Sequence, residues 1–187
     1  RGFEGPLEPK LLQKQTGGLY KKGRMVNIAT GQVEHAAASR FQEVGARVAV
    51  AHSSGAHMAA IALARIGASA PKAIKGAMLA SGMFDMAPVR LSARSAYVSF
   101  TDASEDALSP LRHVANIMTP MILAYGALET PEFIRQSDAF HKALVAASKP
   151  SEVIIGQNYN HFEMIETLAN PYGLLGAATL RQMGLAG

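Results

Sequence analysis

The chain contains no cysteine among its 187 residues. This absence excludes disulfide bonds, catalysis by a thiolate and metal sites built on cysteine. Charged residues are also scarce, at 17%, whereas apolar residues reach 49%, and this balance excludes a largely disordered chain. No apolar run approaches the roughly 20 residues that a membrane-spanning helix needs, so we expect no membrane span. The length predicts a single domain over residues 1–187, with a core of useful size.

A small excess of positive charge lies near the beginning of the chain. The net charge is +4, and the early basic residues are Lys10, Lys14, Lys21, Lys22 and Arg24. A basic cluster can bind nucleic acid or an anionic membrane, but no nucleic-acid-binding motif accompanies this one. We interpret it as a solvated surface and expect no nucleic-acid partner. The first residues show no charged-then-apolar signal segment, and the compartment is left open with the cytoplasm favoured.

Short apolar runs alternate with helix-forming segments from residue 47 onward. The predicted strands are 47–51, 74–81, 120–126 and 152–156. The predicted helices are 56–66, 132–147 and 162–184, the last of them interrupted near Pro171 and Gly173. Because the strand runs are continuously apolar, they indicate a parallel sheet with helices on both faces, which is the α/β class. Residues 87–115 are too long for a plain connection and are predicted to form an inserted lid or pocket segment. Residues 25–43 are predicted to form a helix that leads into the first strand.

The segment Ala51-His52-Ser53-Ser54-Gly55 lies between the first of these strands and its helix. It is close to G-x-S-x-G, the nucleophile elbow, with Ala51 in place of the first glycine. Such a turn holds its serine in a strained conformation and needs small residues where strand and helix nearly touch. The Ser54 N–H, at the start of the helix, is then one donor to an oxyanion. A simpler interpretation is that Ser53 caps the helix.

An acid and a histidine follow the third and fourth strands. Glu129 comes just after 120–126, and His161 comes just after 152–156. The order serine, acid, histidine is that of the hydrolase triad, and all three residues lie at the carboxyl edge of the predicted sheet. The sequence therefore predicts Ser53 as nucleophile, His161 as base and Glu129 as the acid. As alternatives, Glu129 caps the next helix, Glu132 takes the acid role, or His161 is an ordinary loop residue.

The remaining histidines fit the role of base less well. They are His35, His52, His57, His113 and His141. His35 precedes the elbow, His52 and His57 flank Ser53 too closely in sequence, and His113 and His141 fall in the insertion and a helix. No pair of them has metal-ligand spacing with a nearby carboxylate, so we predict no metal and no other cofactor.

Several segments resemble the α/β-hydrolase superfamily, in particular its esterase and arylformamidase (kynurenine formamidase-like) branch. They are HSSGAHMAA, ASGMFDMAPVRLS, LSPLRH, AYGALETPEFIRQS and NHFEMIETL. The resemblance runs from about residue 45 to the end of the chain. It implies that Ser53, Glu129 and His161 form the triad of a serine hydrolase that works through an acyl-enzyme. It also implies that the substrates are esters, aryl esters or N-formyl arylamines.

The chain departs from that family before the elbow. Family members carry H-G-G well upstream of the elbow, where backbone N–H groups complete the oxyanion hole. Here Thr16-Gly17-Gly18-Leu19-Tyr20 resembles the motif, with Thr in place of His. Only 34 residues separate Gly18 from Ser53, fewer than in the family, so the fold is predicted to be shortened or incomplete on its N-terminal side. Gly17 and Gly18 are either the second oxyanion donors or a flexible turn.

The substrate pocket is predicted to involve the insertion and the residues just before it. The candidates are Met83, Phe84, Tyr97 and Phe100, although apolar residues of this kind also serve simply as core. The expected partner is a small ester or amide substrate, and homodimer formation is left open. Two other functions remain as alternatives, a non-catalytic protein with the hydrolase fold and a lipase or peptidase of that fold.

Overall fold

The computed structural model describes residues 24–26, 33–35 and 48–185. The chain divides into two compact units, Arg1–Ala46 and Arg47–Gly187. In the first unit, strands β1 (Arg24–Val26) and β2 (Val33–His35) form an antiparallel pair. The predicted helix over 25–43 is therefore wrong. Valines are β-branched and favour extended backbone, and the glycine between the two strands in sequence disfavours a helix interior. The single domain over 1–187 stays a prediction.

Four strands form the sheet of the second unit. They are β3 (Val48–His52), β4 (Gly76–Ala80), β5 (Met121–Gly126) and β6 (Ser151–Gly156). Each strand pairs in parallel with the next, in the spatial order β3-β4-β5-β6. Parallel neighbours need crossover connections, and helices supply them here. The predicted parallel sheet of the α/β class is confirmed.

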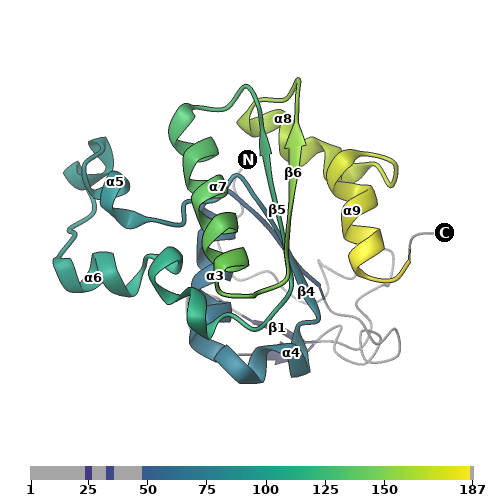
Figure 1. The fold of residues 1–187 in the computed structure, drawn as a ribbon, viewed down its shortest axis with the longest axis horizontal. Helices are drawn as coiled ribbons and strands as arrows, with labels where there is room; N and C mark the ends of the chain where they lie inside the picture. The colour runs from purple at the N-terminus through teal and green to yellow at the C-terminus, as the bar shows by residue number, and fades with distance from the viewer. Residues whose placement is uncertain (1–23, 27–32, 36–47, 186–187) are drawn as a thin grey trace. The chain divides into compact units, whose positions relative to one another are not determined.

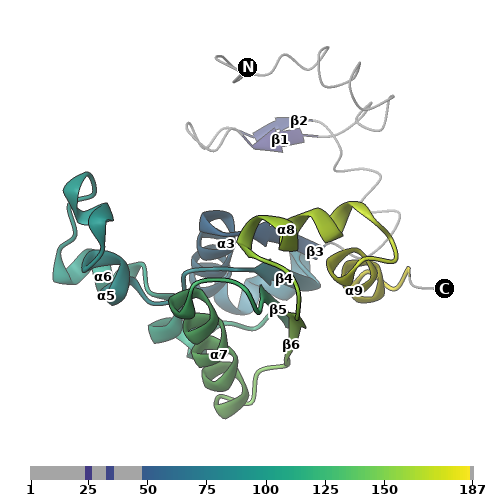
Figure 2. The ribbon, with the colours of Figure 1, turned by 90° about the horizontal axis from the view of Figure 1, so that it is seen from above.

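Helices cover both faces of this sheet (Figures 1 and 2). Helices α3 (Ser54–Ile66) and α7 (Pro131–Ala146) cover one face, and α8 (His161–Glu166) and α9 (Leu174–Gln182) cover the other. The short elements η1 (Gly67–Ser69), α4 (Ala70–Ala73) and η4 (Thr167–Ala169) complete the connections. No helix within the described ranges is both long and apolar enough to span a membrane.

Alternation along the strands divides the core into two layers. Ala77 and Leu79 of β4 face α3 and α7, whereas Met78 and Ala80 face α8 and α9. Every residue of β4 and β5 is buried, which explains why their sequences are continuously apolar. Burying one side chain the size of Leu or Met contributes about 1.5–3 kcal/mol, so these central strands anchor the unit.

The segment between β4 and β5 forms four short helices. They are α5 (Met86–Arg90), η2 (Ala93–Ala96), α6 (Asp102–Ala107) and η3 (Pro110–Asn116). The Asp85 side chain caps α5, and Thr101 and Ser104 form a capping box on α6. Arg90 pairs with Asp102 of α6 at 2.6 Å. Helices α5 and α6 lie together to one side of α7 in the view of Figure 1, and a lid function for the segment stays a prediction.

Candidate active site

Ser53 lies in the turn between β3 and α3 in an uncommon backbone conformation. Its φ is 56° and its ψ is −124°, and such a positive φ is rare outside glycine. Its N–H donates to the carbonyl of Ala80 over 2.9 Å, which fixes the turn to the neighbouring strand. A Cβ at Gly55 would lie 3.8 Å from the Cβ of Ala51, so the two small residues of the motif face one another. The strain, of order 1–3 kcal/mol, is offset by this surrounding structure.

The structure brings Ser53, His161 and Glu129 together in one hydrogen-bonded row. His161 Nε2 lies 3.1 Å from Ser53 Oγ, and His161 Nδ1 lies 2.8 Å from Glu129 Oε2. His161 begins α8 just after β6, and Glu129 follows β5, so both reach the edge of the sheet where β3 ends. Glu132, the rival acid, instead bonds Arg135 and Gln136 of its own helix.

The hydrogen bonds define what this row can do chemically. A carboxylate only accepts hydrogen bonds, so the Nδ1–H of His161 donates to Glu129. The Nε2 of His161 then carries the lone pair and accepts from the Ser53 hydroxyl. This is the tautomer that a general base needs if it is to take the proton from a serine nucleophile.

Three aromatic rings surround the ring of His161. His52 and Phe133 each have their ring centroid 4.5 Å from it, and Phe162 meets it edge-on at 5.3 Å. His52 Nε2 also donates to the carbonyl oxygen of His161 over 2.9 Å. Burial, and then the nearby His161, lower the pKa of His52 below its ordinary value of 6.5. The lowered pKa favours the neutral His52 ring, and the bond from its Nε2 helps to fix the backbone of His161.

The first turn of α3 directly follows Ser53. The helix begins at Ser54, and no side chain among the described residues caps it. The N–H groups of a first helical turn lack partners within the helix and favour negative charge, as an oxyanion requires. The other predicted donors, Gly17 and Gly18, lie outside the described residues.

Comparison with curated proteins finds relatives that are formamidases. Over 174 residues the chain is 28% identical to the kynurenine formamidase of Danio rerio, and the match covers 87% of this chain and 59% of the relative. The kynurenine formamidase of Salmo salar is also 28% identical, over 175 residues. The chain thus spans about three fifths of the length of the curated relatives it matches. No protein-family model matches the chain.

Comparison with solved structures finds hydrolases. A thioesterase-like protein of Silicibacter sp. gives a TM-score of 0.61 at 21% identity, over 74% of this chain and 52% of that one. An esterase of Thermogutta terrifontis with bound butyrate gives a TM-score of 0.52 at 20% identity, over 75% and 57%. The chain has the α/β-hydrolase fold. The resemblance to the esterase and formamidase branch of that superfamily is confirmed.

A small cavity lies beside the ring of His161, at the carboxyl edge of the sheet. Its volume is about 140 Å³, and it is lined by Met83, Pro88, Val89, Ser92, Arg94, Thr130, Glu132, Phe133 and Gln136. Phe133 both lines the cavity and contacts the ring of His161. Its lining combines residues of the insertion with the beginning of α7, and its apolar part suits an acyl or aryl group.

The predicted pocket residues take different places in the structure. Met83 lines the small cavity, and Phe100 packs against the cluster that Met83 forms with Met86 and Val89. Phe84 is buried in the core, where it stacks on Phe140 with ring centroids 4.3 Å apart. Tyr97 is 75% exposed in the insertion and does not line the cavity.

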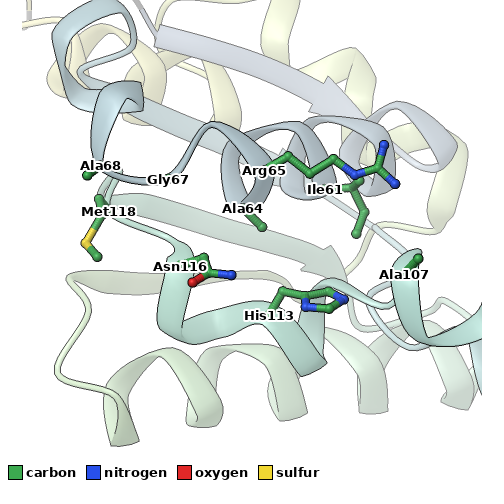
Figure 3. A pocket seen from close by; sticks show the side chains of 9 residues that line it. All are labelled: Ile61, Ala64, Arg65, Gly67, Ala68, Ala107, His113, Asn116 and Met118. Carbon is green, nitrogen blue, oxygen red and sulfur yellow. The ribbon is translucent and has the colours of Figure 1, made fainter.

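A second cavity, of about 580 Å³, lies at the far end of α3 from Ser53 (Figure 3). Its lining comes from the end of α3, from η1 and from η3, and includes Arg65, His113 and Asn116. This cavity is not lined by Ser53, Glu129 or His161. Within the part of the chain that the structure describes, no three His, Asp or Glu side chains gather as metal ligands.

Two residues of the site were missed by sequence reasoning. Ser81 donates from Oγ to Glu129 Oε1 over 2.6 Å, and Phe133 contacts the ring of His161. A hydroxyl at the end of the predicted strand 74–81 was a usable signal for Ser81, since the other site residues also follow strands. Nothing in the sequence pattern distinguishes Phe133 from a core residue of its helix.

Proposed function

We propose that the chain is a serine hydrolase that cleaves a carboxylic ester or an aryl formamide. The observation that carries the proposal is the pair of hydrogen bonds on His161, at 3.1 Å to Ser53 Oγ and 2.8 Å to Glu129 Oε2. A nucleophile, an orienting acid and a base, in this order along the chain, are the parts that acyl transfer on this fold requires. The similarity to kynurenine formamidases supports the same reaction class.

The proposed reaction has two balanced stages. Ser53 Oγ attacks the carbonyl carbon while His161 Nε2 takes its proton, and the oxyanion accepts a hydrogen bond from the Ser54 N–H. The tetrahedral intermediate collapses, His161 returns the proton to the departing alcohol or amine, and an acyl-Ser53 ester remains. Water then attacks this ester, gives one proton to His161 and releases the acid, and the proton returns to Ser53. Throughout, Glu129 orients the ring and stabilises its cationic form.

The small cavity beside His161 supports a compact group on one side of the scissile bond. Its volume of about 140 Å³ suits a short acyl chain or one aromatic ring, and Phe133 offers a ring face within it. The curated relatives are formamidases, which favours an aryl formamide as the first substrate to test. Comparing kcat/KM for N-formylkynurenine, p-nitrophenyl acetate and p-nitrophenyl butyrate measures this preference.

The first prediction concerns the nucleophile. We expect Ser53→Ala to abolish labelling by a fluorophosphonate probe and to lower kcat on p-nitrophenyl acetate by at least about 1,000-fold. Ser69→Ala is the matched control, because Ser69 is an exposed serine beyond the end of α3, and it should label and turn over like the wild type. A wild-type chain that neither labels nor hydrolyses any of the three substrates would instead identify a non-catalytic protein with the hydrolase fold.

A further inference from the structure

Ser81 is a fully buried serine that directly follows strand β4. Its hydroxyl donates to Glu129 Oε1 over 2.6 Å, and its N–H donates to the carbonyl of Ala124 over 2.7 Å. Its φ of 52° lies in the left-handed region. Residues other than glycine are uncommon there, and those that occur gather at functional sites, where surrounding bonds maintain the strain.

The carboxylate of Glu129 depends on donors from the protein. Its side chain has 0% exposure, and an ionised group removed from water needs hydrogen bonds to hold its charge. Ser81 Oγ and the Gly126 N–H donate to Oε1, and His161 Nδ1 donates to Oε2. Gly126 ends β5, the strand that leads to Glu129, whereas Ser81 directly follows the neighbouring strand β4. Ser81 is therefore the donor that ties the carboxylate to a second strand of the sheet.

The end of β4, which Ser81 follows, also contacts the turn that carries the nucleophile. Strand β4 lies between β3, which leads to Ser53, and β5, which leads to Glu129. The Ser53 N–H donates to Ala80, and the adjacent Ser81 N–H donates to Ala124. Backbone bonds thus run from the turn of the nucleophile, through the end of β4, to β5, the strand that leads to Glu129.

We propose that Ser81 is a positioning residue of the hydrolase, an inference that rests on the proposed function. Its hydroxyl fixes the orientation of the Glu129 carboxylate and stabilises its negative charge, so that Oε2 faces His161 Nδ1. Ser81 does not line the cavity beside the site. Its effect on catalysis therefore passes through Glu129 and His161.

The test separates the hydroxyl from the backbone strain. Ser81→Gly removes the hydroxyl at a residue whose positive φ glycine adopts without strain. We expect kcat to fall about 10- to 100-fold, as small misplacements of catalytic groups do, while KM for p-nitrophenyl acetate stays unchanged. The acidic limb of the kcat/KM profile should move to higher pH, because the ionised carboxylate that orients His161 has lost one of its three donors.

A matched control exists elsewhere in the chain. Ser148 also has a positive φ, of 56°, but it follows the end of α7, where a left-handed residue commonly ends a helix. Ser148→Gly should keep the wild-type kcat and pH profile. Ser81→Ala removes the same hydroxyl while keeping the strained backbone. We expect the two Ser81 variants to differ in melting temperature, because only Ser81→Gly relieves the backbone strain. The same fall in kcat in both variants would then assign the effect on catalysis to the hydroxyl.

The outcomes distinguish this inference from the function on which it rests. A wild-type kcat and an unmoved acidic limb in Ser81→Gly, in a protein that still labels at Ser53, would overturn the positioning role alone. Absence of labelling and turnover in the wild type would overturn the proposed function and this inference together. A lower kcat with unchanged KM, together with slower fluorophosphonate labelling of Ser53, supports it.

Discussion

Single residues around His161 decide how its ring is held and which charges it meets. His52 has its ring centroid 4.5 Å from that ring and donates from Nε2 to the His161 carbonyl. Because a carbonyl oxygen only accepts, Nε2 of His52 carries a proton in the neutral ring. Burial, followed by the nearness of His161, lowers the pKa of His52 from 6.5. In the proposed reaction, in which positive charge develops on His161, a neutral His52 places no second cation beside that ring.

The lowered pKa gives His52 a measurable effect on stability. The folded state binds fewer protons at His52 than the unfolded state, so this residue lowers the free energy of unfolding as pH falls below about 6.5. His52→Gln keeps a donor and cannot titrate. We expect its free energy of unfolding, measured with urea between about pH 5 and pH 7, to fall less at acid pH than that of the wild type.

His113→Gln is the control for this measurement, because the His113 ring also bonds a backbone carbonyl, that of Asp106 at 2.8 Å, away from His161. The change in pH dependence that His52→Gln shows beyond that of His113→Gln is assigned to His52. Identical pH dependence in His52→Gln and the wild type would contradict the assignment to His52.

The juxtaposition of Ser53, Glu129 and His161 was predictable because each residue follows a buried strand, and the carboxyl ends of parallel strands share one edge. The same rule places Ser81 at that edge, because it directly follows β4. His52 lies too close to Ser53 in sequence to serve as the base. Its bond to the backbone of His161 depends on the alignment of β3 with α8, which no local pattern encodes.

The turns after β5 and β6 are elements that hold each other in place. The Ala127 N–H donates to the Gly156 carbonyl over 2.8 Å, and the Leu128 N–H donates to the Tyr159 carbonyl over 3.1 Å. A Cβ at Gly126 would lie 2.0 Å from the Tyr159 carbonyl oxygen. The turn that carries Glu129 and the turn that carries His161 can therefore approach only because residue 126 lacks a side chain.

Gly126→Ala tests this contact between turns. We expect the free energy of unfolding to fall by about 1–3 kcal/mol, because backbone atoms must separate to admit the methyl group. The kcat should fall with it, since the same movement displaces His161 from Glu129. Gly55→Ala is the comparison for stability, as its Cβ meets Ala51 at an ordinary contact distance of 3.8 Å. Equal thermal unfolding midpoints for the two variants would count against the close approach.

Some strands and helices could be predicted from the sequence, and others could not. The runs around β4 and β5 were recognisable because strands buried on both faces have no polar positions. The pair β1 and β2 was mistaken for a helix because strands of three residues are too short to show a period of two. The short helices of the insertion depend on caps and ion pairs, such as the Thr101 box and Arg90 with Asp102, rather than on a long apolar stripe.

Across the whole second unit, burial is uneven. Strands β4 and β5 are buried at every position, whereas residues 91–99 of the insertion are all exposed. The insertion is closed at its base by the Leu111 N–H, which donates to the Phe84 carbonyl over 2.9 Å, and His57 Nε2 reaches the Leu108 carbonyl at 2.7 Å. Because residues 91–99 are exposed, whereas Met86 and Val89 are buried, we expect the insertion to open locally without disturbing the sheet.

Hydrogen exchange followed by mass spectrometry measures this difference. We expect peptides from β4 and β5 to exchange only through global unfolding, and peptides covering residues 86–107 to exchange earlier, through local opening. Because Pro88 and Val89 of this segment line the cavity beside His161, a bulky phosphonate on Ser53 should slow exchange in 86–107 and leave β4 unchanged. The contrary result is equal protection of residues 86–107 and of β5 in the free protein. It would show that residues 86–107 unfold only together with the sheet. Access to Ser53 would then not depend on local opening of this segment.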